Sequence, residues 1–167
     1  MDACMRALLN SGFVNFRMRA MLVSMACHHL QLDWKAVALH LARHFLDFDP
    51  GIHYPQIQMQ AGLTGFNTLR IYNPVQQSLK QDADASYIRE FVPELSGYPV
   101  PLQHQPWLIT PMEALMFAEL TPGYANPIID IKETGRAARE RLWRWRNSEG
   151  VKANVSRLLN TQVVKHA

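Results

Sequence analysis

The chain has 167 residues, of which 48% are hydrophobic and 19% are charged, with a formal net charge of +3. This length and composition suit one domain with a buried core, and they exclude collagen-like, low-complexity and disordered classes. Two cysteines, Cys4 and Cys27, exclude a disulfide-rich scaffold and indicate a reducing cytoplasm. We expect no secretory signal and no membrane span, because no long apolar run is present. The small positive charge permits contact with nucleic acid without indicating it.

The first 46 residues have the periodicity of helices and show no alternation of period two. Asp2 and Asp33 are expected to be N-cap residues of two helices. The middle helix of this region is apolar around most of its circumference, as is typical of a helix buried on several sides. The sequence thus predicts three helices, over residues 3–9, 15–30 and 34–45.

Residues 47–55 read DFDPGIHYP, with two acids, two prolines, a glycine, a histidine and a tyrosine. Proline and glycine disfavour a regular helix, so we expect an irregular segment here. A short helical turn over 56–61 and a loop over 62–65 are expected to follow.

The second half of the chain is also predicted to be helical, with long connections. Expected helix starts are Asn73-Pro74, Asp84, Thr110-Pro111 and Asp130. Four prolines predict an extended surface connection over 96–111, and Gly150 is expected to separate the last two helices. The expected helices extend over 85–91, 112–120, 131–147 and to about 163, with a loop over 121–127. The fold class predicted is all-α, a multi-helical orthogonal array with long loops in one partial domain, 1–167.

A metal site is not predicted. His40 and His44 stand four residues apart on one helix face, a spacing that can chelate zinc, but the sequence places no third ligand beside them. Two cysteines cannot supply the thiolates of an iron–sulfur cluster, and no phosphate-binding glycine motif occurs.

Several separated segments, in order, resemble the FAD-binding helical domain of the DNA photolyase/cryptochrome family. They are DACMRALLNSGFVNFRMRAMLVS, LDW, HFLDFDPGIHYPQIQM, RIYNPVQQSLKQDADASYIREFVPEL and YANPIIDIKETGRAARERLW. The resemblance implies the C-terminal half of that domain, without the N-terminal α/β domain and the first part of the helical domain. It implies FAD as cofactor, bound weakly or not at all by such a fragment. It also implies, for full-length relatives, light-driven electron transfer from reduced FAD to UV-damaged DNA.

The resemblance places an arginine–aspartate pair, Arg19 and Asp47, beside the flavin ring. A guanidinium there stabilises the anionic reduced ring, and a carboxylate orients the guanidinium. Asp49 matches a second carboxylate near the ring, and His53 matches the position facing flavin N5. From the residues alone, the alternatives are a salt bridge without a cofactor, a loop acid that accepts backbone N–H groups, and a loop histidine.

Three apolar residues match positions that line the ring, although plain core packing is the alternative: Phe13, Phe16 and Leu41. Trp34 matches the middle of the family's tryptophan electron-transfer chain, with a core anchor as the alternative. Ile57 stands where the member nearest the flavin would lie, and it cannot be oxidised. Tyr54 is a possible substitute in electron transfer.

DNA is an implied partner, because Arg70 matches a family arginine that contacts the DNA backbone. Ala20 and Met59 replace residues of the pocket that holds a pyrimidine dimer, so we expect this chain to be incomplete for repair, and enzymatic activity is left open. Two further interpretations remain. One is a helical module without enzymatic activity that self-associates or binds a partner, such as a missing N-terminal half; the other is nucleic-acid binding through Arg70 and the basic tail.

Overall fold

The computed structural model describes residues 1–64, 70–117 and 124–162. Within these ranges every regular element is a helix and there is no strand, which confirms the all-α prediction. The elements are α1 (Asp2–Ser11), α2 (Phe16–Ser24), the π-helix η1 (Met25–His29), α3 (Trp34–Ala42), α4 (Pro50–Gln60), α5 (Pro74–Gln81), α6 (Ser86–Phe91), the 3-10 helix η2 (Pro93–Leu95), α7 (Val100–His104), the 3-10 helix η3 (Pro106–Leu108), α8 (Pro111–Phe117), α9 (Ile131–Arg146) and α10 (Glu149–Gln162).

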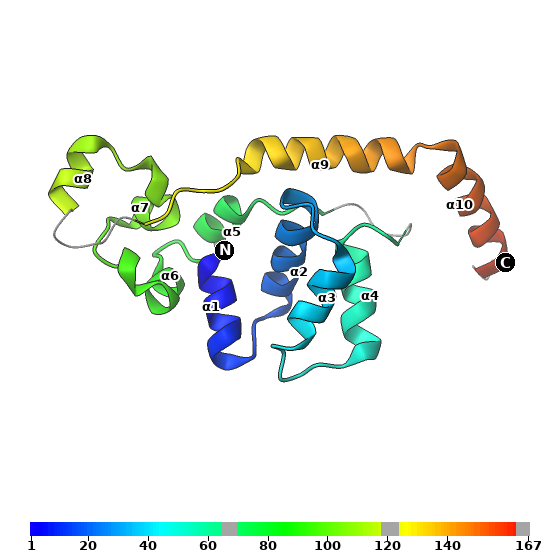
Figure 1. Ribbon diagram of the computed structural model, residues 1–167, viewed down its shortest axis with the longest axis horizontal. Coiled ribbons are helices and arrows are strands. Elements are labelled where there is room, and N and C mark those ends of the chain that lie inside the picture. The colour runs from blue at the N-terminus through cyan, green and yellow to red at the C-terminus, as the bar shows by residue number, and fades with distance from the viewer. Residues whose placement is uncertain (65–69, 118–123, 163–167) are drawn as a thin grey trace.

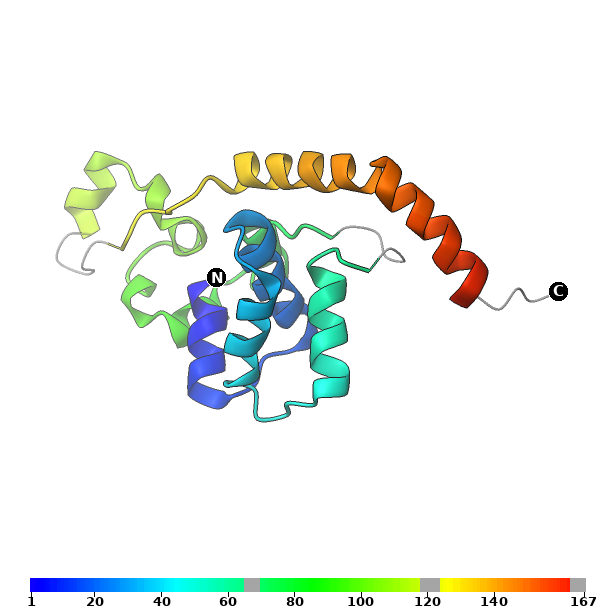
Figure 2. The ribbon, with the colours of Figure 1, turned by 45° about the vertical axis from the view of Figure 1, so that its right-hand side comes forward.

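Helices α1 to α4 lie side by side as a bundle, and α9 runs across one end of that bundle (Figure 1). In the bundle α2 and α3 both contact α4, while α9 contacts η1 at the end of α2. Figure 2 shows α6 beside α1 and α10 extending away from the bundle. The arrangement therefore leaves the start of α2 and the start of α4 at the end of the bundle opposite α9.

The bundle is held by one apolar core, built by residues spaced three and four positions apart on facing helices. Leu8 of α1 and Ala38 of α3 are fully buried in it. A second core joins the start of α1 to α6 and α7, where Tyr87 and Phe91 pack against both cores. The second core ties the middle of the chain to the bundle.

Local capping explains several of the helix boundaries. Gly12 adopts φ 68° after α1, and the side chains of Asn15, Asp33, Asn73 and Asp130 accept backbone N–H bonds at the starts of α2, α3, α5 and α9. These bonds confirm the predicted starts at Asp33, Asn73 and Asp130.

Asp2 was expected to cap α1, and this is wrong. Asp2 lies within the first turn of α1, and Met1 at the N-cap makes no side-chain capping bond. The Asp2 carboxylate instead accepts a hydrogen bond from the hydroxyl of Tyr124. A tertiary contact has therefore replaced the local one.

The prediction of an irregular segment over 47–55 is also wrong, because α4 begins at Pro50. The Asp49 carboxylate accepts the N–H groups of Gly51 and Ile52, at 2.7 and 3.2 Å. Pro50 occupies the first turn, where its missing N–H needs no partner. Pro55 costs one bond within the helix, and α4 continues through it to Gln60.

Residues 96–111 are not the extended connection that four prolines suggested. They contain α7 and η3, and the side chains of Leu102, Gln103 and His104 are buried. Pro99 and Pro106 stand at the starts of these short helices, where proline is tolerated. The prolines therefore mark helix starts rather than extended chain.

Two further boundaries differ from the prediction. The first turn of α6 is capped mainly by Asp82, whose carboxylate accepts the N–H groups of Tyr87 and Ile88, while Asp84 accepts only that of Ser86. Gly150 lies inside α10 rather than between helices, and the break follows α9 instead. Parts of four predicted elements lie outside the described residues: 118–120 and 163 of two helices, and 65 and 121–123 of two loops.

Candidate functional site

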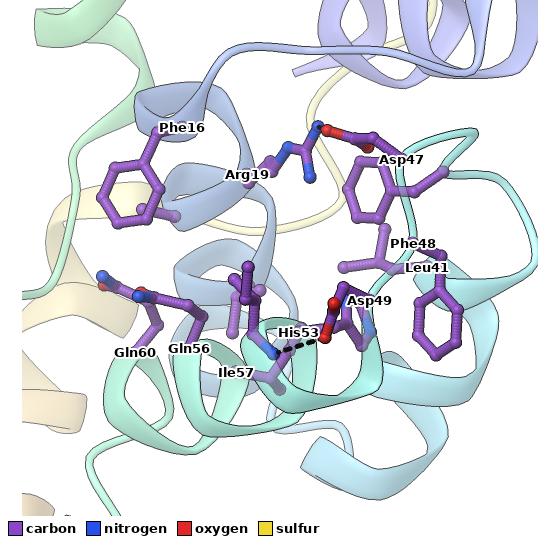
Figure 3. A pocket seen from close by; sticks show the side chains of 14 residues that line it. Phe16, Arg19, Leu41, Asp47, Phe48, Asp49, His53, Gln56, Ile57 and Gln60 are labelled. Carbon is purple, nitrogen blue, oxygen red and sulfur yellow. Dashed lines mark hydrogen bonds and ion pairs between the residues drawn. The ribbon is translucent and has the colours of Figure 1, made fainter.

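A cavity of about 140 Å³ opens between α2, the segment after α3, and α4. Most of its wall is apolar, and its polar groups come from a few side chains (Figure 3). The lining residues are Phe16, Arg19, Ala20, Val23, Leu41, Phe45, Asp47, Phe48, Asp49, Ile52, His53, Gln56, Ile57 and Gln60. The structure thus brings together six of the predicted cofactor-binding residues: Phe16, Arg19, Leu41, Asp47, Asp49 and His53.

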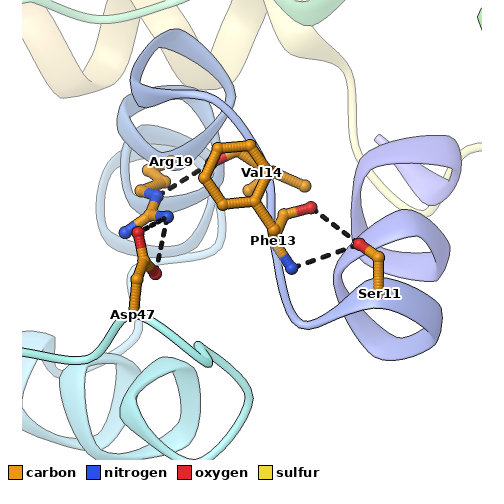
Figure 4. A network of polar contacts seen from close by, with 5 residues as sticks. All are labelled: Ser11, Phe13, Val14, Arg19 and Asp47. Atoms are coloured by element: carbon orange, nitrogen blue, oxygen red, sulfur yellow. Dashed lines mark hydrogen bonds and ion pairs between the residues drawn. The ribbon is translucent and has the colours of Figure 1, made fainter.

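Arg19 and Asp47 form the polar centre of this site. Nη2 of Arg19 donates to both carboxylate oxygens of Asp47, at 2.8 and 2.7 Å, and its Nε donates to the Val14 carbonyl at 2.9 Å (Figure 4). The guanidinium carbon lies 4.1 Å from the ring centre of Phe45 and 5.4 Å from that of Phe13. The cation is therefore fixed between two rings and a carboxylate, as is typical of a positioned arginine.

Asp49 and His53 both have a structural partner as well as a place at the cavity. Asp49 caps α4 with one of its carboxylate oxygens, as the loop-acid alternative expected. The His53 side chain is buried, and its Nε2 donates to the Ala38 carbonyl at 2.9 Å, because a carbonyl can only accept. His53 is thus neither in a loop nor free to turn, and its ring is fixed at the cavity wall.

Sequence reasoning missed two polar side chains of α4, Gln56 and Gln60. Gln56 and Gln60 line the cavity on the same helix face as Asp49 and His53, three, four and seven residues apart. Their amides point toward the ring of Phe16 in Figure 3. This spacing is visible in the sequence, but it indicates a shared face only once residues 50–60 are recognised as one helix.

Gln56 has a further property that bears on ligand binding. Its Oε1 is buried and has no hydrogen-bond partner among the described residues. An unsatisfied buried acceptor costs free energy, and a ligand that donates a hydrogen bond there would recover it.

The other predicted site residues lie outside the cavity. Phe13 is exposed and reaches the site only through Arg19. Trp34 packs against the bundle core, and Tyr54 lies beside the rings of Phe48 and His53, at 6.2 and 5.4 Å. Arg70 lines a separate groove between α5 and α9.

The described histidine and cysteine side chains define no metal centre. The rings of His40 and His44 meet edge to face, with ring centres 4.9 Å apart. No group of three histidine, cysteine or acidic side chains that could hold a metal occurs across 1–64, 70–117 and 124–162. Over the same part of the chain, no helix is both long and apolar enough to cross a membrane.

The chain is similar to photolyases and cryptochromes along most of its length. A deoxyribodipyrimidine photo-lyase of Alkalihalophilus pseudofirmus is 34% identical over 132 residues, which cover 77% of this chain and 28% of that relative. The solved cryptochrome of Synechocystis sp. matches with a TM-score of 0.76 at 27% identity, covering 83% of this chain and 29% of that one. An archaeal photolyase of Sulfolobus tokodaii, solved with two FAD molecules, matches with a TM-score of 0.70 at 27% identity, covering 85% and 31%.

The family described as the FAD binding domain of DNA photolyase matches residues 1–144, and the chain belongs to this family. The resemblance read from the sequence motifs is thereby confirmed, together with the fold that it implied. The chain spans less than a third of the length of the relatives that it matches, so it corresponds to a part of them.

The residues at the cavity fit the cofactor by which this family is defined. An isoalloxazine ring presents apolar faces, an edge that becomes negative on reduction, and N–H donors. The cavity offers apolar walls, the Arg19 cation and the unsatisfied Oε1 of Gln56. The donor set is therefore chemically complementary to a flavin.

Proposed function

We propose that this chain forms one wall of the FAD site of a photolyase or cryptochrome-type protein. The observation that carries the proposal is the Arg19–Asp47 pair, which two hydrogen bonds hold at the mouth of an apolar cavity. When bound, FAD would supply the electron that light transfers to a substrate.

Each residue of this wall has a role that its contacts support. Arg19 stabilises negative charge on the reduced ring, and Asp47 keeps the guanidinium in the required orientation. Asp49 holds the start of α4 in place, so that His53 and Gln56 face the cofactor. Phe16 and Leu41 exclude water from the ring faces.

The substrate class follows from the relatives and is part of the proposal. One relative is named a deoxyribodipyrimidine photo-lyase, so the protein to which this wall belongs would act on UV-damaged DNA. Arg70 is exposed and would contact the DNA backbone. Trp34 and Tyr54 would carry electrons to the flavin, since Ile57 cannot.

The test measures FAD binding by quenching of flavin fluorescence. Asp47→Ala is expected to weaken binding about tenfold or more, because it removes a charge-assisted contact that positions Arg19. Glu94→Ala is the matched control: Glu94 pairs with Arg6 through two hydrogen bonds of 2.9 and 2.5 Å, away from the cavity. Glu94→Ala removes the same charge and the same kind of ion pair as Asp47→Ala, so this variant should bind FAD with the affinity of the wild type.

Two results would contradict the proposal. In the first, the wild-type protein does not quench flavin fluorescence at any concentration of the protein. In the second, Asp47→Ala and Glu94→Ala change the affinity equally, which would make the Arg19–Asp47 pair a structural contact only.

A second candidate function is self-association around the cavity mouth. Phe16 and Ile52, which line the cavity, are 56% and 64% exposed, and Leu46, which directly precedes Asp47, is 85% exposed; exposed apolar side chains of this size are candidates for an interface. Sedimentation of the wild type and of Leu46→Asp tests this function, since only the wild type should form a dimer. A monomeric wild type would exclude it.

A further inference from the structure

Among the described residues that line the cavity, Gln56 alone has a buried side-chain atom without a hydrogen bond. Across 1–64, 70–117 and 124–162 four such atoms occur: Thr64 Oγ1, Gln77 Oε1, His104 Nε2 and Gln56 Oε1. The first three belong to residues outside the cavity wall. The Gln56 amide stands in that wall and points toward the ring of Phe16 (Figure 3).

Helix α4 itself does not supply the missing donor. In its first turn the N–H groups of Gly51 and Ile52 bond to the Asp49 carboxylate. The N–H group of His53 bonds to the Asp49 carbonyl. Later N–H groups of an α-helix bond to carbonyls of the preceding turn. A donor for Gln56 therefore has to come from another element or from a ligand.

The donors on the neighbouring walls are held by other partners. Nε of Arg19 donates to the Val14 carbonyl, and its Nη2 donates to the Asp47 carboxylate. Nε2 of His53 donates to a carbonyl of α3. The wall thus presents the Oε1 of Gln56 as an acceptor that an occupant of the cavity can satisfy.

A glutamine at this position gives the fold no packing advantage. An apolar side chain of similar size would line the same wall without a desolvated amide, and a buried acceptor without a partner destabilises the folded state. Such atoms are rare in folded proteins, so each requires a physical reason. A ligand that donates a hydrogen bond to Gln56 provides that reason.

We infer that Gln56 is a specificity-determining residue of this site, whose Oε1 accepts an N–H group on the edge of a planar nitrogen heterocycle. The ligand class rests on the proposed function, since FAD carries such a group in the imide of its isoalloxazine ring and another in the amino group of its adenine. The apolar walls suit the faces of either heterocycle, and Gln56 selects by the edge. A ligand of the same shape without the N–H group leaves the acceptor unpaired.

The test combines two pairs of ligands with three variants. Lumiflavin is compared with its derivative methylated at the imide nitrogen, by fluorescence quenching. Adenosine monophosphate is compared with purine riboside monophosphate, which lacks the amino group, by titration calorimetry. Gln56→Leu removes the acceptor and Gln56→Glu keeps it. Gln58→Leu is the matched control, because Gln58 belongs to the same helix and does not line the cavity.

The wild type and Gln58→Leu are expected to bind the N–H ligand of one pair about tenfold more tightly than its partner. Gln56→Leu should bind both ligands of that pair alike, because the residue and the ligand then lack the same contact. Gln56→Glu should retain most of the preference. The pair that is distinguished identifies the imide or the amino group as the donor.

Three results would overturn the inference. In the first, the wild type distinguishes neither pair or binds none of the ligands. In the second, Gln56→Leu retains the preference of the wild type. In the third, Gln56→Glu loses the preference as fully as Gln56→Leu does, which would show that the site does not use an acceptor.

The melting temperature of the ligand-free protein is a readout that separates this role from a structural one. Gln56→Leu should melt at the temperature of the wild type or above it, because the substitution removes a buried polar atom that has no partner. A lower melting temperature would assign the side chain to the fold and contradict the inference, whatever the ligands do.

Failure of this inference can be told from failure of the proposed function. If Asp47→Ala weakens FAD binding while Gln56→Leu keeps the ligand preference of the wild type, only the role of Gln56 is refuted. If Gln56 controls the preference while Asp47→Ala binds FAD as Glu94→Ala does, only the role of the Arg19–Asp47 pair is refuted.

Discussion

Arg19 and Asp47 stand 28 positions apart, and yet a single nitrogen of Arg19 contacts both oxygens of the Asp47 carboxylate. The two partners are not equally buried: the side chain of Arg19 is 25% exposed and that of Asp47 is 51% exposed. The guanidinium is further held by the Val14 carbonyl and the ring of Phe45. The fold thus fixes the Arg19 guanidinium, and the Asp47 carboxylate contacts it from the solvent side.

This asymmetry predicts different stabilities for two variants. Asp47→Ala should lower the free energy of unfolding by less than about 1 kcal/mol, because exposed ion pairs contribute little. Arg19→Ala should cost about 1–3 kcal/mol, since it also removes the ring contact and leaves the Val14 carbonyl without its partner. Urea titrations of both variants measure the difference, and equal costs would contradict the prediction.

The cap of α4 gives a second prediction. Asp49→Ala should reduce the free energy of unfolding by about 0.5–2 kcal/mol, because Gly51 and Ile52 lose their acceptor. Asp49→Ser is the matched control, since serine caps a helix nearly as well and should retain most of the stability. Thermal melts report the order wild type, Ser, Ala; a serine variant as unstable as the alanine variant would show that charge, not capping, matters here.

His28 predicts a pH dependence of stability. Burial lowers the pKa of His28 from its ordinary value of 6.5, with Arg141 and His29 acting in the same direction and the hydrogen bond to the Gln60 carbonyl opposing them. The unfolded chain therefore binds a proton at this histidine that the folded chain resists. Stability is expected to fall as the pH falls below about 6.5.

His28→Gln should remove this part of the pH dependence while keeping a side-chain donor for the Gln60 carbonyl. The slope of unfolding free energy against pH, measured by urea titration between neutral and mildly acidic pH, should decrease by at most about 1.4 kcal/mol per pH unit. A slope identical to that of the wild type would refute the role of His28.

Two glycines predict opposite effects of the same substitution. Gly12→Ala should destabilise the fold by about 1–2 kcal/mol, because φ is 68° and a Cβ would overlap the side chain of Leu46. Gly150→Ala should stabilise α10 by up to about 1 kcal/mol, since a Cβ there meets nothing within 4 Å. Thermal melts of the pair test both signs, and a Gly12→Ala variant as stable as the wild type would contradict the prediction.

Among the site residues, Asp49 shows how far sequence reasoning reached. The bare sequence offered it as a loop acid that accepts backbone N–H groups, and it does accept them. The same reasoning missed that these N–H groups belong to the first turn of a helix, because two prolines and a glycine indicated an irregular segment there. Gln56 and Gln60 lie in the short helical turn that was predicted over 56–61, but the face that they share with His53 exists only because the helix begins at Pro50.

Local rules decided the helix starts at Asp33, Asn73 and Asp130, because an N-cap and the N–H groups it accepts lie within three residues of each other. The sequence motifs also determined the family, since they retain their order and spacing along most of the chain. Only the tertiary structure decided which side of α4 faces Arg19, that Arg70 and Lys132 line one groove, and that Asp2 binds Tyr124 rather than capping α1. These arrangements depend on how whole helices pack, and packing free energy is summed over residues far apart in the chain, which no short pattern contains.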